Sequence, residues 1–250
     1  GYLLRAATGE ERRIREERKI GIITPEEANL LQFQTLSDSV AEANFRKFAN
    51  QGTGIVPTLV ISRNIAYLDS MDFSRDTILN YLGPKLKESY QWRIDRYAKE
   101  DLQSRENRKR LFEASARLLP IVQKSGMKII AGTDAGYLNT YDYPGVGIHL
   151  ELALMVDYGL SPLQALTASI VNGPAYFGLE KDYGAISSGK KASLLFLRNN
   201  PLERIENTLS IESVIAEGQY FSRKDLDRML SEIKMWVVQK ESSKQKEAVD

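Results

Sequence analysis

Hydrophobic and polar positions divide the chain into a helical first part, a middle part that mixes strands and helices, and a last part with short strands. Residues 1–50 are rich in charge, and TPEEANLLQF predicts a helix with Thr24 as its cap and Pro25 at its first position. The β-branched run from Ile55 to Ile61 then predicts one buried strand, in which Pro57 is the residue least suited to a sheet.

Residues 72–125 return to helical spacing, with a break at Leu82-Gly83-Pro84 and an end at Gly126. Residues 127–131 follow as a run that is apolar apart from Lys128, which is typical of a parallel strand covered on both faces. A strand, a long helical connection and a second strand together indicate an α/β unit.

Two further helices are predicted after the tyrosine-rich loop GYLNTYDYPGVG. The first begins near Ile148. The second has Ser161 as its cap, Pro162 at its first position and Gln164 in a capping box, and it is predicted to stop at Asn172-Gly173-Pro174.

The pattern changes again near the end of the chain. YGAISSGKKASLLFL and SIESVIAEGQYF predict short antiparallel hairpins around Gly189 and Gly218. Apolar residues at helical spacing from Arg223 onward predict an amphipathic helix, and the charged tail QKESSKQKEAVD is expected to be frayed or disordered.

Composition narrows the classes of function. The 34 basic and 33 acidic residues nearly cancel, so no overall field attracts nucleic acid or an anionic membrane. No stretch approaches the roughly 20 apolar residues of a spanning helix, and the first residues lack the apolar core of a secretory signal. We expect a soluble chain, whether cytoplasmic, periplasmic or secreted. The absence of cysteine excludes disulfides, thiolate metal sites and cysteine nucleophiles.

The candidate chemistry centres on KIIAGTDAG, residues 128–136, where Asp134 follows the second predicted strand. Active sites of parallel α/β folds gather at the carboxyl ends of their strands, which favours a functional carboxylate. The alternative is that Asp134 only caps the turn through its own backbone. The single histidine, His149, begins a helix, where a lone histidine more often forms a supporting hydrogen bond than a metal bond.

The loop beside Asp134 supplies candidates for a substrate pocket. The candidates are one hydroxyl neighbour and three aromatic residues of the same loop: Thr133, Tyr137, Tyr141 and Tyr143. Loop tyrosines also pack on the rim of a fold without binding a ligand, so both readings stay open.

A long ordered string resembles a known family. GTDAG, then GIHLELALMVDYGLSPLQALTASIVNGPAYFGL, then GAISSGKKASLLFLRNNPLERIENTLSIESVIAEGQYF resembles the C-terminal part of the metal-dependent amidohydrolase superfamily, in particular its imidazolonepropionase and Xaa-Pro dipeptidase-like branch. The resemblance runs from about Ile55 to about Phe221. It implies a TIM-barrel hydrolase with one or two divalent metals, zinc being the first expectation, in which Asp134 binds metal and acts as the general base.

The chain departs from that family in its histidines. The resemblance implies several histidine ligands that precede Asp134, whereas the one histidine here follows it. A TIM barrel also takes about 250 residues for eight strand and helix units, and only two parallel strands are predicted here. We therefore expect an α/β fold that is the C-terminal portion of a TIM barrel over residues 1–178, with β-sandwich return strands over 179–222 and a C-terminal helix and tail over 223–250.

The resemblance implies hydrolysis of C–N bonds in peptides or cyclic amides by metal-activated water. By itself the chain is expected to be inactive. Whether it binds a metal without further ligands is left open. Its expected substrate is a small or dipeptide-like amide. Its expected protein partner is either the missing N-terminal half of the barrel or another chain. Binding to nucleic acid or to a membrane is not expected. The alternatives are a non-catalytic binding module and one subunit of a split enzyme, and homo-oligomers are open.

Overall fold

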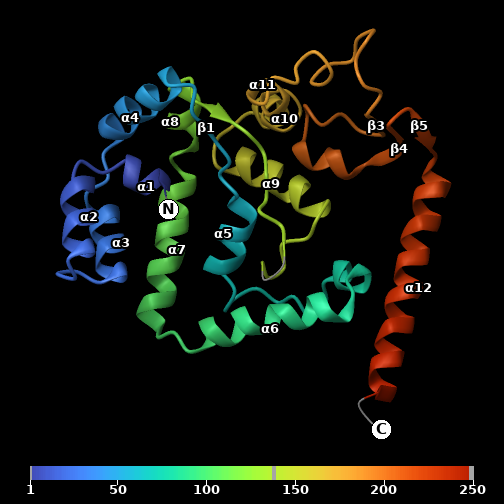
Figure 1. Ribbon diagram of the computed structural model, residues 1–250, viewed down its shortest axis with the longest axis horizontal. Coiled ribbons are helices and arrows are strands. Elements are labelled where there is room, and N and C mark those ends of the chain that lie inside the picture. Colours follow the sequence, from blue (N-terminus) through green and yellow to red (C-terminus); the bar gives the residue numbers. More distant parts are fainter. Residues whose placement is uncertain (1, 137–138, 248–250) are drawn as a thin grey trace.

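The computed structural model describes residues 2–136 and 139–247, with side chains described as far as Ser242. Its first part is helical (Figure 1). The helices are α1 (Tyr2–Ala6), α2 (Glu11–Lys19), α3 (Pro25–Gln34) and α4 (Asp38–Asn50). Thr24 caps α3 as the sequence predicts, because its hydroxyl accepts the Glu27 N–H at 3.1 Å and the Glu27 carboxylate accepts the Thr24 N–H at 2.8 Å.

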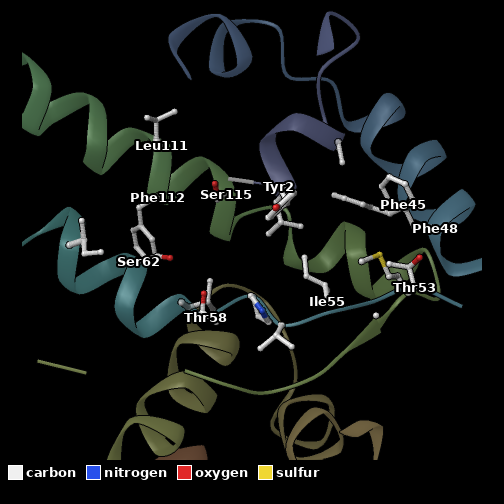
Figure 2. Close-up of a pocket in the computed structure, with 18 of the residues that line it drawn as sticks. Tyr2, Phe45, Phe48, Thr53, Ile55, Thr58, Ser62, Leu111, Phe112 and Ser115 are labelled. Atoms are coloured by element: carbon white, nitrogen blue, oxygen red, sulfur yellow. The ribbon is translucent and has the colours of Figure 1, made fainter. Parts of the chain in front are cut away.

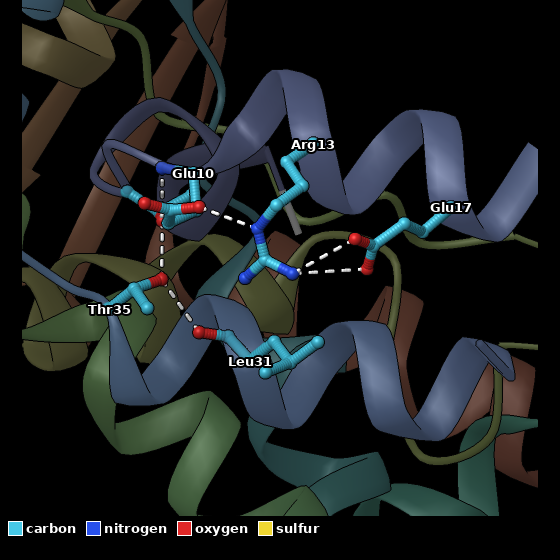
Figure 3. Close-up of polar contacts among 6 residues, drawn as sticks. Glu10, Arg13, Glu17, Leu31 and Thr35 are labelled. Atoms are coloured by element: carbon cyan, nitrogen blue, oxygen red, sulfur yellow. Dashed lines mark hydrogen bonds and ion pairs between the residues drawn. The ribbon is translucent and has the colours of Figure 1, made fainter. Parts of the chain in front are cut away.

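Helices α2 and α3 are arranged as a helical hairpin whose polar contacts are drawn in Figure 3. Arg13 donates to Glu10 at 2.7 Å and to Glu17 at 3.0 Å along α2, while the Thr35 hydroxyl at the end of α3 donates to the Leu31 carbonyl at 2.7 Å. Exposed ion pairs of this kind contribute little to stability, so the buried apolar residues of the hairpin hold it to the body.

The predicted α/β unit is confirmed. Strands β1 (Gly54–Ile55) and β2 (Lys128–Ile129) pair in parallel, and helices connect them on the route between. The connecting elements are α5 (Leu59–Ala66), the 3-10 helix η1 (Thr77–Tyr81), α6 (Pro84–Ala98), α7 (Leu102–Ala116) and α8 (Leu119–Lys124). The break predicted at Leu82-Gly83-Pro84 separates η1 from α6.

The strand predicted over Ile55–Ile61 is wrong, because β1 ends at Ile55 and Leu59 begins α5. Pro57 has no N–H to pair in a sheet. The N–H groups of Leu59 and Val60 are bound instead by the carboxylate of Glu151, which lies 92 residues from Leu59 in the sequence. That partner stabilises the first turn of a helix where β-branched residues alone favour a strand.

Three helices follow β2: α9 (Val146–Asp157), α10 (Pro162–Ile170) and α11 (Asn172–Tyr176). The Ser161 capping box of α10 is confirmed, with the Gln164 N–H and the Ser161 hydroxyl 3.2 Å apart. Helix α10 ends at Ile170, next to the stop predicted at Asn172-Gly173-Pro174, and Asn172 begins the separate short helix α11 and donates its side-chain amide to the Ile129 carbonyl of β2 at 2.7 Å. This bond lies on the edge of β2 away from β1.

The last part contains the antiparallel sheet β3-β4-β5, formed by β3 (Leu194–Leu197), β4 (Ile211–Ala216) and β5 (Gln219–Phe221), with the 3-10 helix η2 (Ile205–Leu209) after β3. The hairpin at Gly218 is confirmed, because Glu217 and Gly218 both have positive φ, as a two-residue type I′ turn requires. The hairpin predicted around Gly189 is wrong. The predicted stretch 183–197 does contain β3, which pairs antiparallel with β4, but residues 183–193 form no strand, and the Lys190 ammonium binds the carbonyls of Glu180 and Tyr183.

Helix α12 (Arg223–Glu247) confirms the predicted amphipathic helix and runs further than expected, through most of the tail predicted to be frayed. Val237 is 1% exposed, and Lys87 of α6 pairs with Glu241 at 2.6 Å. The helix contacts η1 and α6 along its second half (Figure 1). Contact with α6 therefore orders a charged segment that its composition alone would leave disordered.

The core lies around β1 and β2, between α4, α5, α7, α8 and α9. In the described part of the chain the only parallel sheet has two strands, so a partial TIM barrel stays a prediction and a helix-rich α/β arrangement is what the chain shows. No helix among the described residues is long and apolar enough to cross a membrane.

Candidate active site

Asp134 lies in the turn after β2, exposed and with a backbone φ of 62°. Aspartate is one of the few residues that tolerate this left-handed conformation. The Asn139 amide donates to Asp134 Oδ2 at 3.2 Å and also binds the Asp134 carbonyl, and Arg93 of α6 donates to Asn139 Oδ1 at 3.1 Å. Asp134 is therefore oriented by Asn139, which Arg93 orients in turn.

Thr133 supplies a hydrogen bond inside the same turn. Its hydroxyl accepts the Ala135 N–H at 3.1 Å. Among the described contacts, the Asp134 carboxylate accepts no backbone N–H. The Thr133 hydroxyl therefore provides the hydrogen bond that closes this turn. The Asp134 side chain is left facing Asn139 and solvent.

Asp142 is a second carboxylate of this loop, and sequence reasoning missed it. It is 1% exposed, and within the described residues neither of its oxygens has a hydrogen-bond partner. Burial and the nearby charge of Asp134 together raise its pKa to about 6, against a smaller lowering effect of the Thr133 side chain. Asp142 stands between two tyrosines in a polar-looking loop, so no periodicity marked it as buried.

Glu151 of α9 is the third carboxylate near these loops. It is completely buried, and its two oxygens accept the N–H groups of Leu59 and Val60, each at 2.9 Å. Burial, with a smaller contribution from the charge of Asp142, raises its pKa to about 7, although the two backbone hydrogen bonds lower it. The signal was in the sequence, because Glu151 shares the apolar helical face of Ile148, Leu152 and Met155.

Two of the predicted pocket tyrosines pack against the α5–α6 connection. The ring of Tyr141 stacks on Phe73 at 3.7 Å, and Tyr143 is buried with its hydroxyl donating to Asp76 at 2.6 Å. Burial raises the pKa of both phenols, and the hydrogen bond to Asp76 raises that of Tyr143 further. Tyr137 lies outside the described residues. A substrate-binding role for these residues stays a prediction.

His149 joins α9 to η2. Its Nδ1 is 3.0 Å from the Thr208 hydroxyl, which itself donates to the Ile205 carbonyl at 2.9 Å, so Nδ1 carries the proton in this pair. Burial lowers the His149 pKa, which favours the neutral ring. In the described contacts His149 does not bind Asp134, so its supporting role at the predicted metal site stays a prediction.

A cavity of about 810 Å³ lies beside β1, away from the residues predicted for the site (Figure 2). Phe45 and Phe48 of α4 and Phe112 of α7 surround it, and Ile55 of β1 faces it. Among the described residues, neither the N–H nor the carbonyl of Val56, which follows β1, has a backbone hydrogen-bond partner. The cavity therefore lies along an edge of β1 that is open to a further strand.

The fit to a metal ion is partial. Among the described residues no three histidine, cysteine, aspartate or glutamate side chains gather into a metal-binding group. Asp134 offers an exposed carboxylate, and Asp142 offers two buried oxygens without partners. Unpaired buried carboxylate oxygens suit a cation, so this chain fits part of a metal site and leaves the other ligands to be supplied.

Residues 66–220, which include the turn of Asp134 and the buried carboxylates, match the amidohydrolase family. The chain belongs to the amidohydrolase family. A bottromycin amidohydrolase shares its fold with a TM-score of 0.61 at 24% identity, over 74% of this chain and 40% of that one. A Xaa-Pro dipeptidase does so with a TM-score of 0.52 at 18% identity, over 79% and 43%. At these identities the likeness concerns the fold alone.

Curated relatives match over shorter stretches. The adenine deaminase of Ruegeria sp. (strain TM1040) is 36% identical over 112 residues, which is 43% of this chain and 17% of that protein. The adenine deaminase of Moorella thermoacetica (strain ATCC 39073 / JCM 9320) is 33% identical over 63 residues, 25% of this chain and 11% of that protein. The chain thus spans less than a fifth of these relatives, and none of the matches singles out the imidazolonepropionase or dipeptidase branch.

Proposed function

We propose that the chain carries the Asp134 part of the active site of a metal-dependent hydrolase that cleaves C–N bonds in peptides or cyclic amides. The observation that supports it most is an exposed Asp134 at the carboxyl end of a parallel strand, oriented by Asn139 in a chain of the amidohydrolase family. The adenine deaminases it resembles are named for removing an amino group, which is also hydrolysis of a C–N bond.

Asp134 is the proton carrier in this proposal. Its carboxylate takes a proton from the attacking water and delivers it to the leaving amine. The Asn139 amide binds one oxygen of the carboxylate at 3.2 Å, which holds the side chain in one orientation while the second oxygen faces the water. A divalent metal beside it would polarise the scissile carbonyl and acidify the water.

The other metal ligands come from polypeptide outside this chain. His149 is bound to Thr208, and in the described residues no further histidine or cysteine is available. Zinc is the metal that the family resemblance favours. The chain covers 40% and 43% of two structural neighbours. The part of such proteins that this chain does not cover is where the remaining ligands would lie.

A split enzyme is the second candidate, and the open edge of β1 favours it. A further strand could pair with the backbone of Val56 and place apolar side chains in the cavity beside Ile55 and Phe112. The third candidate, a non-catalytic binding module, would use the same edge to bind a partner without hydrolysis.

The test measures metal and turnover together. The purified chain, with any polypeptide that co-purifies, is analysed by elemental mass spectrometry and assayed on dipeptides, cyclic amides and adenine. We expect about one or two metals per complex and a loss of kcat/KM of about 10²–10⁴-fold in Asp134→Asn. Asp157→Asn, an exposed aspartate on α9, is the matched control and should keep full activity.

Undiminished activity of Asp134→Asn would show that Asp134 is not the base. A complex with a second polypeptide but no metal and no turnover would favour the binding module. Metal and turnover that depend on the second polypeptide would identify the split enzyme.

A further inference from the structure

Asp142 is a buried charge without a described stabilising partner. It is 1% exposed, and within the described part of the chain no ion pair and no hydrogen bond of normal geometry reaches its two oxygens, the Thr133 side chain being the polar group beside them. A buried carboxylate in that condition is strongly destabilising, and natural proteins usually pair it with a cation or with N–H donors. Among the described residues no cationic side chain pairs with Asp142, so a bound cation can supply the positive partner.

The loop keeps room for this carboxylate at Gly147. A Cβ on residue 147 would stand 2.8 Å from Asp142 Oδ1 and 3.2 Å from the methyl carbon of Thr133. The Asp142 carboxylate and the Thr133 side chain therefore meet over the bare Cα of Gly147, at the start of α9. Thr133 is the neighbour of Asp134 in the chain. The carboxylates of Asp134 and Asp142 therefore belong to the same loop after β2.

We propose that Asp142 is a second carboxylate ligand, beside Asp134, for the divalent cation of this site. The inference rests on the proposed function, which places that cation at Asp134. A cation between the two carboxylates supplies the partner that the Asp142 oxygens lack, and it relieves the repulsion between two like charges in one loop.

The donor atoms of the two side chains determine which cation can serve as a probe. Asp134 and Asp142 offer carboxylate oxygens, whereas the sole imidazole is held by Thr208 and the chain has no thiolate. Carboxylate oxygens bind hard cations such as Mg²⁺ and Mn²⁺, and they are also ligands of zinc, the metal that the family resemblance favours. Mn²⁺ is the appropriate probe, since its paramagnetism reports free and bound ion directly.

The experiment uses the purified chain together with any polypeptide that co-purifies, freed of metal by a chelator and titrated with Mn²⁺ at pH 8. Electron paramagnetic resonance measures the affinity, and circular dichroism measures the melting temperature without metal. We expect Asp142→Asn to lower the Mn²⁺ affinity at least about tenfold. The same variant should raise the metal-free melting temperature by about 3 °C or more, because an unpaired buried charge is removed.

Two further variants keep the result interpretable. Gly147→Ala displaces the Asp142 carboxylate without removing it, so it should also weaken Mn²⁺ binding. Asp157→Asn removes an exposed carboxylate of the same helix and should change neither the affinity nor the melting temperature.

Any of three results would overturn the assignment of Asp142: a wild-type affinity in Asp142→Asn, a lower metal-free melting temperature in that variant, or no uptake of Mn²⁺ at millimolar concentration by the wild-type chain. Asp134→Asn separates this inference from the proposed function. If only Asp134→Asn abolishes binding, the role of Asp134 stands and that of Asp142 fails; if only Asp142→Asn does, Asp142 is the ligand and the role of Asp134 fails.

Discussion

Asp142 and Glu151 are two buried carboxylates nine residues apart, and the structure treats them in opposite ways. Glu151 accepts two backbone N–H groups at 2.9 Å, whereas Asp142 has no hydrogen-bond partner in the described part of the chain. Burial raises the pKa of both, to about 7 for Glu151 and about 6 for Asp142. Burial alone therefore does not reveal a carboxylate's role; its partners do.

The difference separates a carboxylate that connects two helices of the fold from a carboxylate that is a candidate metal ligand. Glu151 connects α9, which follows the Asp134 loop, to α5, which follows β1, and so ties together the segments that leave the two parallel strands. Asp142 forms no such connection within the described residues, and its Oδ1 lies where a side chain on residue 147 would clash. Four expected outcomes test this distinction.

The largest effect is expected for Glu151→Leu. Two buried N–H groups, those of Leu59 and Val60, would lose their acceptor, which destabilises the fold by about 2–5 kcal/mol. Urea denaturation followed by circular dichroism measures this change. A loss of unfolding free energy below about 1 kcal/mol would mean that the first turn of α5 finds other acceptors. Glu151 would then not be the residue that connects α9 to α5.

The second effect is a pH dependence that Glu151 contributes. Its folded pKa of about 7 lies above the model-peptide value of 4.5, so the folded state binds the proton more tightly. That contribution to stability is complete below about pH 4.5 and is lost as the pH rises through about 7, by about 3 kcal/mol in all.

The measurement of this dependence is the difference in unfolding free energy between the wild type and Glu151→Gln from pH 4 to pH 8. The difference cancels the carboxylates that titrate alike in both proteins. We expect wild-type stability to fall relative to the variant as the pH rises. A difference that does not vary with pH would contradict the pKa assigned to Glu151.

The third effect is a coupling between Gly147 and Asp142. Gly147→Ala places a methyl group 2.8 Å from Asp142 Oδ1, which is expected to destabilise the fold by about 1–3 kcal/mol. In an Asp142→Ala background the same change should cost about 1 kcal/mol less, since the carboxylate is gone. A double-mutant cycle by urea denaturation measures the coupling, and an additive cycle would place the carboxylate elsewhere.

The smallest effect is expected for Asn139→Ala. The Asp134 carboxylate that Asn139 binds is exposed, so water replaces the lost hydrogen bond and the unfolding free energy should change by less than about 1 kcal/mol. The same denaturation measurement checks it. A larger loss would show that Asn139 holds the turn through the Asp134 carbonyl and not only the side chain.

Local features of the fold were predictable wherever neighbouring residues decide the geometry. The capping boxes at Thr24 and Ser161 and the hairpin at Gly218 each need only residues within three or four positions of one another. The parallel pairing of β1 and β2 also followed from the order of strand, helices and strand. Asp134 was singled out for its place after a buried run, and the structure places it in the loop five residues after the end of β2; its function is a proposal.

The candidate site was less predictable, because its partners are distant in the sequence. Leu59 begins a helix since Glu151 binds its N–H from 92 residues away, and no local pattern contains that contact. The hydroxyl of Tyr143, a candidate for the substrate pocket, donates to Asp76 across 67 residues. The hairpin expected at Gly189 failed because Lys190 binds carbonyls of its own loop in place of a second strand.

The sequence by itself determined the α/β order of elements, the helix caps and the presence of Asp134 after the second parallel strand, because those depend on the conformational preferences of adjacent residues. The tertiary structure alone decided that Glu151 connects two helices and that Asp142 is a candidate metal ligand. Both are acidic residues in neighbouring segments, and only the packing around each determines whether N–H groups, solvent or no partner at all meets its charge.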